Sequence, residues 1–174
     1  MTAVLCTRAD SVYRGLGADC FDLARDARTY HGTAPVVAHP PCRGWGRLAH
    51  FAKTRPDEAA LGIWCLQTVR MFGGVLEHPA GSRLFKLCGV APGAPDRCGG
   101  WVLPIYQQWF GHPAQKATWL YIRGVAPADV PRLPLVLGQA SRTVESQDAA
   151  ARERTPFDLA VWLLELASIA RVSV

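Results

Sequence analysis

The chain has 174 residues, of which 49% are hydrophobic and 19% are charged, and its formal net charge is +5. This composition excludes a disordered chain, and the length favours a single domain covering residues 1–174. No apolar run approaches the roughly 20 residues of a membrane span, and the first residues lack the pattern of a signal peptide. We therefore expect a cytoplasmic protein with no membrane partner.

The N-terminal part of the chain alternates short apolar runs with turns. We predict a strand at Ala3–Cys6, a helical turn from Asp10 to Leu16 and a second strand at Cys20–Ala24. The β-branched run Ala34–His39 predicts a buried strand that leads directly into a loop. That loop reads Pro40-Pro41-Cys42-Arg43-Gly44-Trp45-Gly46.

The central part contains the clearest helical pattern. Apolar residues at i, i+3, i+4 and i+7 predict a helix over Asp57–Phe72 that ends at Gly73. The predicted apolar stripe consists of Ala60, Leu61, Trp64, Cys65, Thr68, Val69 and Phe72. A short strand, Gly74–Leu76, then delivers Glu77-His78-Pro79 to a second loop. This order predicts a βαβ unit in a small Rossmann-like α/β fold with a mostly parallel sheet and flanking helices. Ligands of such sheets bind beyond the carboxyl ends of the strands, so we expect 39–45 and 77–82 to lie side by side.

The C-terminal part is expected to finish the sheet and cover it. We predict two strands, Gln107–His112 and Lys116–Ile122, joined by a turn. Residues 123–151 are rich in proline and polar residues and predict a surface loop, and 152–174 hold a final helix that opens at Pro156. Its buried side is predicted to consist of Leu159, Val161, Trp162, Leu163, Leu166 and Ile169.

Cys42 is the first candidate for chemistry among six cysteines that show no C-x-x-C spacing. A thiol held by two prolines at the carboxyl end of a buried strand is well placed to act as a nucleophile, and Arg43 would favour the thiolate. Trp45, in the same loop, could stack on a base. The alternative is a structural cysteine whose side chain only packs the loop against the core.

Glu77 is the second candidate, because it follows an apolar strand at the same predicted edge. We expect an acid with a raised pKa, or alternatively a salt-bridged or helix-capping side chain. His39, His78 and His112 fall on neighbouring loops and, with Cys42, could ligate a metal. None has a paired short-range spacing, however, so we expect no metal.

Three motifs, in order over residues 35–122, resemble those of phage-type DNA (cytosine-5) methyltransferases. Residues 36–42 resemble the Pro-Cys motif of the nucleophile, and Gly74-Val75-Leu76-Glu77-His78-Pro79 is similar to the Glu-Asn-Val motif, with histidine in place of asparagine. Residues 107–120 resemble the Gln…Phe-Gly-His-Pro…Lys-x-Thr-x-Leu segment of short phage-encoded members. The resemblance therefore points to a transferase from a phage or prophage that modifies DNA.

The resemblance also implies roles for individual residues. Cys42 would add to C6 of a cytosine, Glu77 would hold and protonate N3, and Lys116 would contact the carbonyl side of the base. The methyl group would come from S-adenosylmethionine. Together with the loop positions, the resemblance implies substrate contacts from His39, Arg43, Trp45, His78, Ser82, Gln107, His112 and Thr118.

The cofactor side departs from the family, because residues 1–34 are short and lack the Phe-x-Gly-x-Gly-Gly turn. The nearest substitutes are Asp22 or Asp26 for the ribose, and Arg8, Asp10 and Ser11 for a phosphate or sugar. Three functions stay open: a compact cytosine-5 methyltransferase acting on DNA or a nucleotide, an enzyme that modifies a base or nucleotide without S-adenosylmethionine, and a non-catalytic remnant that binds nucleic acid or a host protein.

Overall fold

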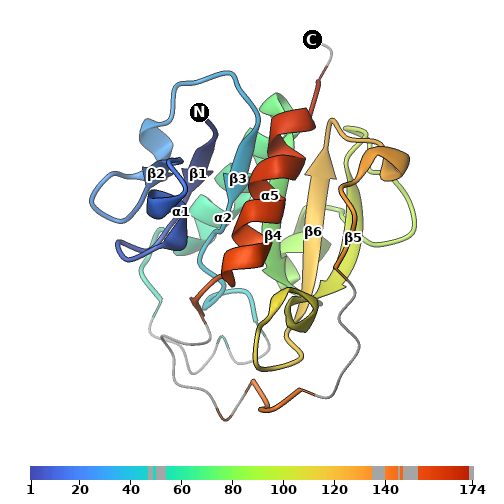
Figure 1. Ribbon diagram of the computed structural model, residues 1–174. Coiled ribbons are helices and arrows are strands. Elements are labelled where there is room, and N and C mark those ends of the chain that lie inside the picture. Colours follow the sequence, from blue (N-terminus) through green and yellow to red (C-terminus); the bar gives the residue numbers. More distant parts are fainter. Residues whose placement is uncertain (47–48, 50–53, 135–139, 145, 147–152, 173–174) are drawn as a thin grey trace.

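The computed structural model describes residues 1–46, 49, 54–134, 140–144, 146 and 153–172. Within these ranges six strands form one sheet in the order β2-β1-β3-β4-β6-β5 (Figure 1). The strands are β1 (Ala3–Leu5), β2 (Asp19–Phe21), β3 (Val36–Ala38), β4 (Gly74–Pro79), β5 (Trp101–Tyr106) and β6 (Ala117–Arg123). The first four are parallel, and β6 pairs antiparallel with both β4 and β5. The predicted α/β class with a mostly parallel sheet is confirmed.

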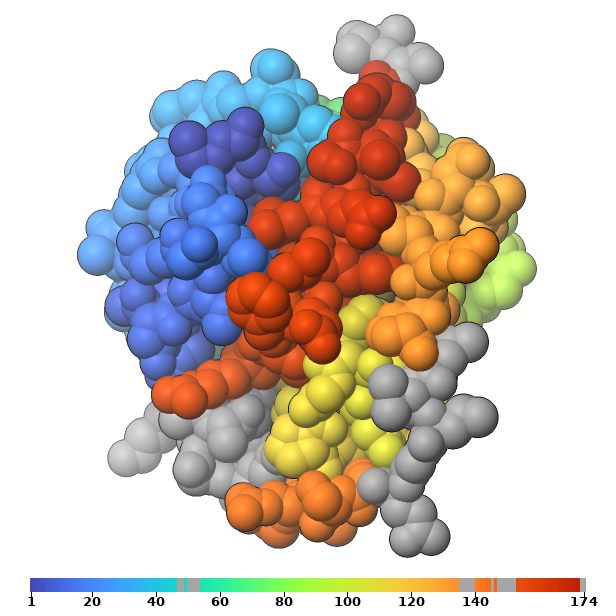
Figure 2. All heavy atoms as spheres, viewed as in Figure 1, coloured from blue at the N-terminus to red at the C-terminus, as the bar shows by residue number. Residues whose placement is uncertain are grey.

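Helices cover both faces of the sheet. Strand residues alternate between the faces, so that Val4, Val37 and Val75 pack toward α5 (Phe157–Ile169), whereas Leu5 and Leu76 pack toward α2 (Glu58–Phe72). The short α1 (Val12–Gly15) lies on the α5 side and α3 (Arg83–Leu87) on the α2 side. In Figure 2, the atoms of α5 (red) lie at the surface between the N-terminal segment (blue) and the segment that follows β6 up to residue 134 (orange).

The unit β3-α2-β4 is the centre of the fold, and its pattern was readable from the sequence. Helix α2 follows Asp57 and ends at Gly73, which has a φ of 84°. The chain then turns at once into β4, with Gly74 at a φ of 102° opposite Val36. A Cβ atom on Gly74 would lie 2.0 Å from the carbonyl oxygen of Val36, so only glycine allows β4 to approach β3 this closely.

The buried stripe of α2 is rotated from the predicted one. Cys65, Thr68 and Val69 are buried as expected, but Ala60 is exposed and Gly62 takes a buried place. Gly62 is required there because the indole of Trp45 presses against it, with Nε1 only 2.8 Å from where a Cβ would lie. The loop after β3 therefore determines which face of the helix is covered.

Several predicted boundaries were wrong. Strand β4 runs on through Glu77, His78 and Pro79, which were expected in a loop, because β6 pairs with all three. Strand β2 stops before Asp22, whose carboxylate accepts hydrogen bonds from the backbone N–H groups of residues 24 and 25 and so turns the chain away.

The predicted strand over residues 107–112 was wrong. Residues Gln107–Phe110 form the short 3₁₀ helix η3, closed by Gly111 in the left-handed conformation, and the partner of β6 is instead β5. Strand β5 contains Pro104, which is compatible with a ladder because β5 is an edge strand among those described. Two further 3₁₀ turns are η1 (Ala27–Thr29) and η4 (Pro127–Asp129).

The helices outside α2 also differ in detail. Helix α3 was not predicted; Ser82 caps it by accepting the Leu84 N–H at 3.2 Å. Pro156 precedes α5 rather than opening it, and Val161 and Ile169 are 41% and 39% exposed, not buried. Ala160 and Ala167 take those inner places. None of the described helices is long and apolar enough to cross a membrane.

Candidate active site at the carboxyl ends of β1, β3 and β4

The sheet order places the candidate residues beside a change in the direction of the strand connections. Strands β2 and β3 lie on opposite sides of β1, and the connections that follow β1 and β3 run over opposite faces of the sheet. This is a topological switch point, outside which doubly wound α/β proteins bind their ligands. The chain leaves β3 here through His39 and the Cys42 loop, and β4 ends beside it with Glu77.

Glu77 lies in a chain of hydrogen bonds that joins it to four other residues. Its Oε2 lies 3.0 Å from Nδ1 of His39, and its Oε1 accepts a hydrogen bond of 2.9 Å from Nε2 of Gln107. The same Gln107 amide donates to Oγ1 of Thr118 at 3.1 Å. On the other side, Nε2 of His39 lies 2.9 Å from the hydroxyl of Tyr13.

The expectation of a raised pKa for Glu77 was wrong. Burial alone would raise the pKa of this carboxyl, but the His39 hydrogen bond and the positive charge of Lys116 outweigh it, and the pKa falls to about 2. Glu77 is therefore ionised at neutral pH and can only accept hydrogen bonds. It follows that Nδ1 of His39 carries a proton and donates to the carboxylate.

Cys42 lies within the electrostatic reach of Glu77. The thiol is half-buried, and burial together with the negative charge of Glu77 raises its pKa, while Lys116 acts in the opposite direction. The Glu153 charge also raises it. Cys42 is thus a protonated thiol in the free protein, and Lys116, not Arg43, supplies the cationic influence.

Arg43 stabilises the loop instead of favouring the Cys42 thiolate, as was predicted. Its guanidinium donates a hydrogen bond of 2.6 Å to the buried Glu58 at the start of α2. The loop is further fixed by Arg83, which donates from its side chain to the Gly44 carbonyl at 3.0 Å and from its backbone to the Trp45 carbonyl at 3.1 Å. Cys42 therefore stands on a loop tied to both α2 and α3.

Two buried side chains near Glu77 have polar atoms without partners among the described residues. They are Oε1 of Gln107 and Nε2 of His112, whose Nδ1 is paired with the backbone of Ala114 at 2.8–3.0 Å. Buried polar groups are normally satisfied, so each such atom calls for an explanation. Both atoms are enclosed by protein, and they extend the buried polar cluster around Glu77.

His78 points away from this chain of hydrogen bonds. Its ring is 1% exposed and packs edge-on against Phe85, with centroids 5.9 Å apart, and neither nitrogen makes a hydrogen bond of normal geometry to a described residue. Burial lowers the pKa of His78 to about 4, so the ring is neutral at pH 7. Direct substrate contact from His78 is not supported by this placement.

Two other predicted substrate residues are structural. Trp45 is 8% exposed and belongs to the core on the α2 side, so its ring is not open for a base to stack on it. Ser82 is buried and caps α3. Lys116 immediately precedes β6, and its charge acts on Cys42, Glu77, His78 and His112 alike.

Four of the five residues predicted to bind a cofactor are engaged in ion pairs within the protein. Arg8 pairs with Asp10 at 2.8 Å and with Glu153 at 3.0 Å. Asp22 accepts two backbone hydrogen bonds of 2.9 Å and pairs with Arg14, while Asp26 caps η1 and pairs with Arg28. Ser11 precedes α1 and makes no side-chain cap.

Sequence reasoning missed Tyr13. Its ring is 1% exposed, and burial raises the pKa of its hydroxyl well above the usual value. The signal was available in principle, because a residue in the segment after β1 lies near the carboxyl ends of the neighbouring strands. The contact with His39 itself depends on the three-dimensional packing.

A cavity of about 650 Å³ lies elsewhere in the molecule. Trp101, Arg123 and Gly124 are among the residues that line it, and none of the predicted site residues does. Within the described ranges, no three His, Cys, Asp or Glu side chains lie close enough together to hold a metal ion.

The fold and the site thus define a mostly parallel α/β protein with a cysteine, a histidine-bound glutamate and a lysine gathered at one edge of its sheet. In comparisons with known proteins, no family model, no curated protein and no solved structure matches this chain.

Proposed function

We propose that this protein is an enzyme that modifies a pyrimidine base, cytosine in particular, through a covalent bond between the Cys42 sulfur and C6 of the ring. The observation that carries the proposal is the convergence of Cys42 and Glu77. The two residues come from neighbouring strands, and the carboxylate is close enough to the thiol to change its pKa. Glu77 is in turn fixed by His39 and Gln107.

The charges of the free site suit a coupled proton transfer. In the proposed step the sulfur bonds to C6, the C5–C6 electron pair shifts to make C5 electron-rich, and N3 takes up a proton. Because Glu77 starts as a carboxylate and Cys42 as a thiol, the proton lost by sulfur travels by way of Glu77 to N3. No net charge is left on the ring, and Lys116 balances the carboxylate throughout.

The resemblance to cytosine-5 methyltransferases would complete the reaction with a methyl group from S-adenosylmethionine. The residues available for that cofactor do not fit it as arranged. Both carboxylate oxygens of Asp22 and of Asp26 already have partners, and the turn after β1 contains no glycine that would allow close approach. We therefore derive no step through S-adenosylmethionine.

This misfit favours a second candidate function, an enzyme that activates the base in the same way but does not use S-adenosylmethionine. The substrate of either enzyme is a nucleic acid or a nucleotide. Flipping a base out of a duplex costs a few kcal/mol, which a single strand or a free nucleotide avoids.

Covalent trapping tests the shared step. A mononucleotide, a single strand and a duplex, each carrying 5-azacytosine, are incubated with the protein and analysed by intact mass. We expect an adduct with the wild type and with Cys98→Ser, a matched control at another half-buried cysteine, and none with Cys42→Ser. Glu77→Gln should slow the adduct by ~10²–10⁴-fold.

The same assay distinguishes the alternatives. If folded wild type forms no adduct with any of the three substrates, the enzymatic proposal fails and a non-catalytic binding protein is left. A 5-fluorocytosine substrate that is trapped only when S-adenosylmethionine is added would establish methyl transfer. An adduct with 5-azacytosine, together with no heat on titration with millimolar S-adenosylmethionine, would establish the second candidate.

A further inference from the structure

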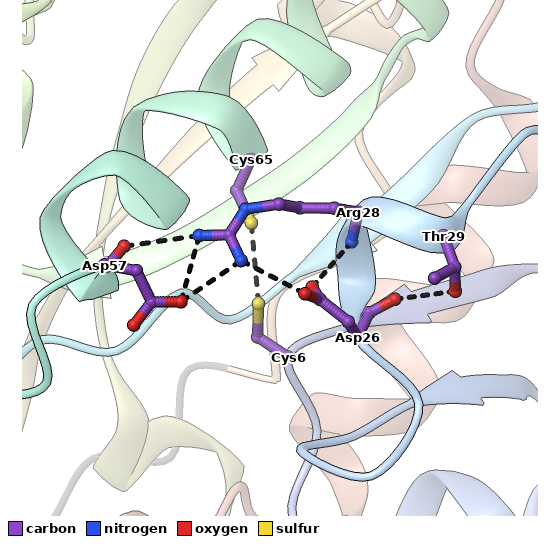
Figure 3. Close-up of polar contacts among 6 residues, drawn as sticks. All are labelled: Cys6, Asp26, Arg28, Thr29, Asp57 and Cys65. Carbon is purple, nitrogen blue, oxygen red and sulfur yellow. Dashed lines mark hydrogen bonds and ion pairs between the residues drawn. The ribbon is translucent and has the colours of Figure 1, made fainter.

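Cys6 and Cys65 form a contact that the proposed chemistry does not use. Cys6 directly follows β1 and is half-buried, and Cys65 is fully buried in the middle of α2. Their Sγ atoms lie 3.5 Å apart although the residues are 59 positions apart in the sequence (Figure 3). All six cysteines lie in the described part of the chain, and no other two of their sulfurs are in such contact.

We propose that Cys6 and Cys65 are an oxidation site that closes reversibly to a disulfide. A disulfide needs a sulfur–sulfur distance of about 2.05 Å, so one side chain must move inward by a small amount. Cys6 is suited to that movement because it ends a strand and begins a loop. It is also the one described residue other than glycine with a positive φ, 62°, so the chain turns sharply where its side chain meets Cys65.

The two thiols have distinct roles in the reaction. With hydrogen peroxide as oxidant, the accessible Cys6 attacks the O–O bond, giving a sulfenic acid and one water molecule. The Cys65 sulfur then attacks the Cys6 sulfur, and a second water molecule leaves. The net change is two thiols and one peroxide to one disulfide and two waters, and a small thiol reductant reverses it by exchange.

The surroundings of Cys65 make it the thiol that reacts second, after Cys6. The hydrogen bond with Cys6 and burial raise the pKa of Cys65 well above its usual value, so it waits as a protonated thiol. Figure 3 shows Arg28 beside the two sulfurs, held by Asp26 and Asp57 at 3.1–3.2 Å. Its positive charge favours the thiolate of Cys65, which is the form that attacks.

The bond would tie the carboxyl end of β1 to α2, close to the proposed active site. The carbonyl of Leu5, the residue before Cys6, accepts a hydrogen bond from the backbone N–H of His39 at 3.0 Å. The disulfide would therefore stiffen the backbone beside His39. The inference does not depend on the proposed function, since it concerns neither Cys42 nor Glu77.

The test treats the full chain with hydrogen peroxide or with oxidised glutathione. Remaining thiols are then alkylated under denaturing conditions, and the protein is mapped by peptide mass. We expect a peptide pair linked through Cys6 and Cys65, a midpoint of thermal unfolding raised by roughly 10 °C, and reversal of both by dithiothreitol. Cys98→Ser should behave as the wild type, and Cys6→Ala should lose the rise.

Mapping of the wild type keeps the test independent of how the variants fold. Recovery of both Cys6 and Cys65 as alkylated thiols after oxidant treatment would overturn the proposal. So would oxidation of Cys6 beyond the sulfenic acid while Cys65 stays free, or a preferred disulfide between other cysteines.

Discussion

Glu77 and His78 are neighbours on β4, and both are deprotonated at neutral pH, which leaves Glu77 charged and His78 neutral. Successive strand residues point to opposite faces of the sheet. Glu77 meets donors from His39 and Gln107 and stays charged, whereas His78 is packed against Phe85 and stays neutral. Both pKa values lie below the usual range, at about 2 and about 4.

These two residues predict a stepped loss of stability in acid. For His78, folding resists protonation, so its contribution is complete above pH ~6.5 and is lost as the pH falls toward 4. For Glu77, the contribution is complete above pH ~4.5 and is lost as the pH falls toward 2. Each step amounts to about 3 kcal/mol. Urea unfolding at a series of pH values measures both.

Two variants separate the steps. His78→Asn, which cannot titrate, should reduce the dependence between pH 4 and 6.5, to which the lowered pKa of His112 also contributes, and should leave the lower step. Glu77→Gln should reduce only the lower step, to which the lowered pKa values of Asp22 and Asp96 also contribute. An unchanged slope between pH 4 and 6.5 in His78→Asn would contradict the assignment of that step to the buried imidazole.

The sequence could indicate that Cys42 and Glu77 meet, but it could not give their charges. The meeting follows from strand order, because parallel neighbours end at the same edge. The low pKa of Glu77 depends on His39 and Lys116, which come from other parts of the chain and cannot be inferred from the apolar residues around position 77. For the same reason Lys116, rather than the adjacent Arg43, acts on the thiol.

At the scale of elements, the close pairing of β3 with the start of β4 depends on Gly74. We expect Gly74→Ala to destabilise the protein by ~4 kcal/mol or more, because its Cβ would overlap the backbone of Val36 and its φ is unfavourable for alanine. Gly89→Ala is the matched control: its φ is 67°, but nothing lies within 4 Å. It should cost about 1–2 kcal/mol in denaturant unfolding. Equal losses in the two variants would show that the overlap is relieved.

Elements with strong periodicity were predictable and the others were not. The helix Glu58–Phe72 shows its period, and the run Val36–Ala38 shows its β-branched apolar composition, within one segment. Strand β5 shows no such pattern, because it lies at an edge and contains Pro104, so its partner β6 defines it. Helix α3 is only five residues long, too short for a period to appear.

At the scale of the whole molecule, the two cores share one sheet. One core joins α5 to Val4, Val37 and Val75, and the other joins α2 to the alternating strand residues. We predict that Leu163→Ala in the first core and Leu66→Ala in the second each lower a single common unfolding transition by about 2–5 kcal/mol. Calorimetry that resolved two transitions, each sensitive to one substitution, would show independent units instead of the single domain we expect.

The two edge strands of the described sheet affect how readily the protein aggregates at high concentration. At one margin, the ring of Pro104 removes a backbone donor from β5. At the other, β2 is three residues long and carries the ion pair of Asp19 with Arg25. Neither border offers an incoming chain a long, flat row of unpaired amides. Strand-by-strand polymerisation, the usual hazard of an open sheet, is thereby discouraged at both borders.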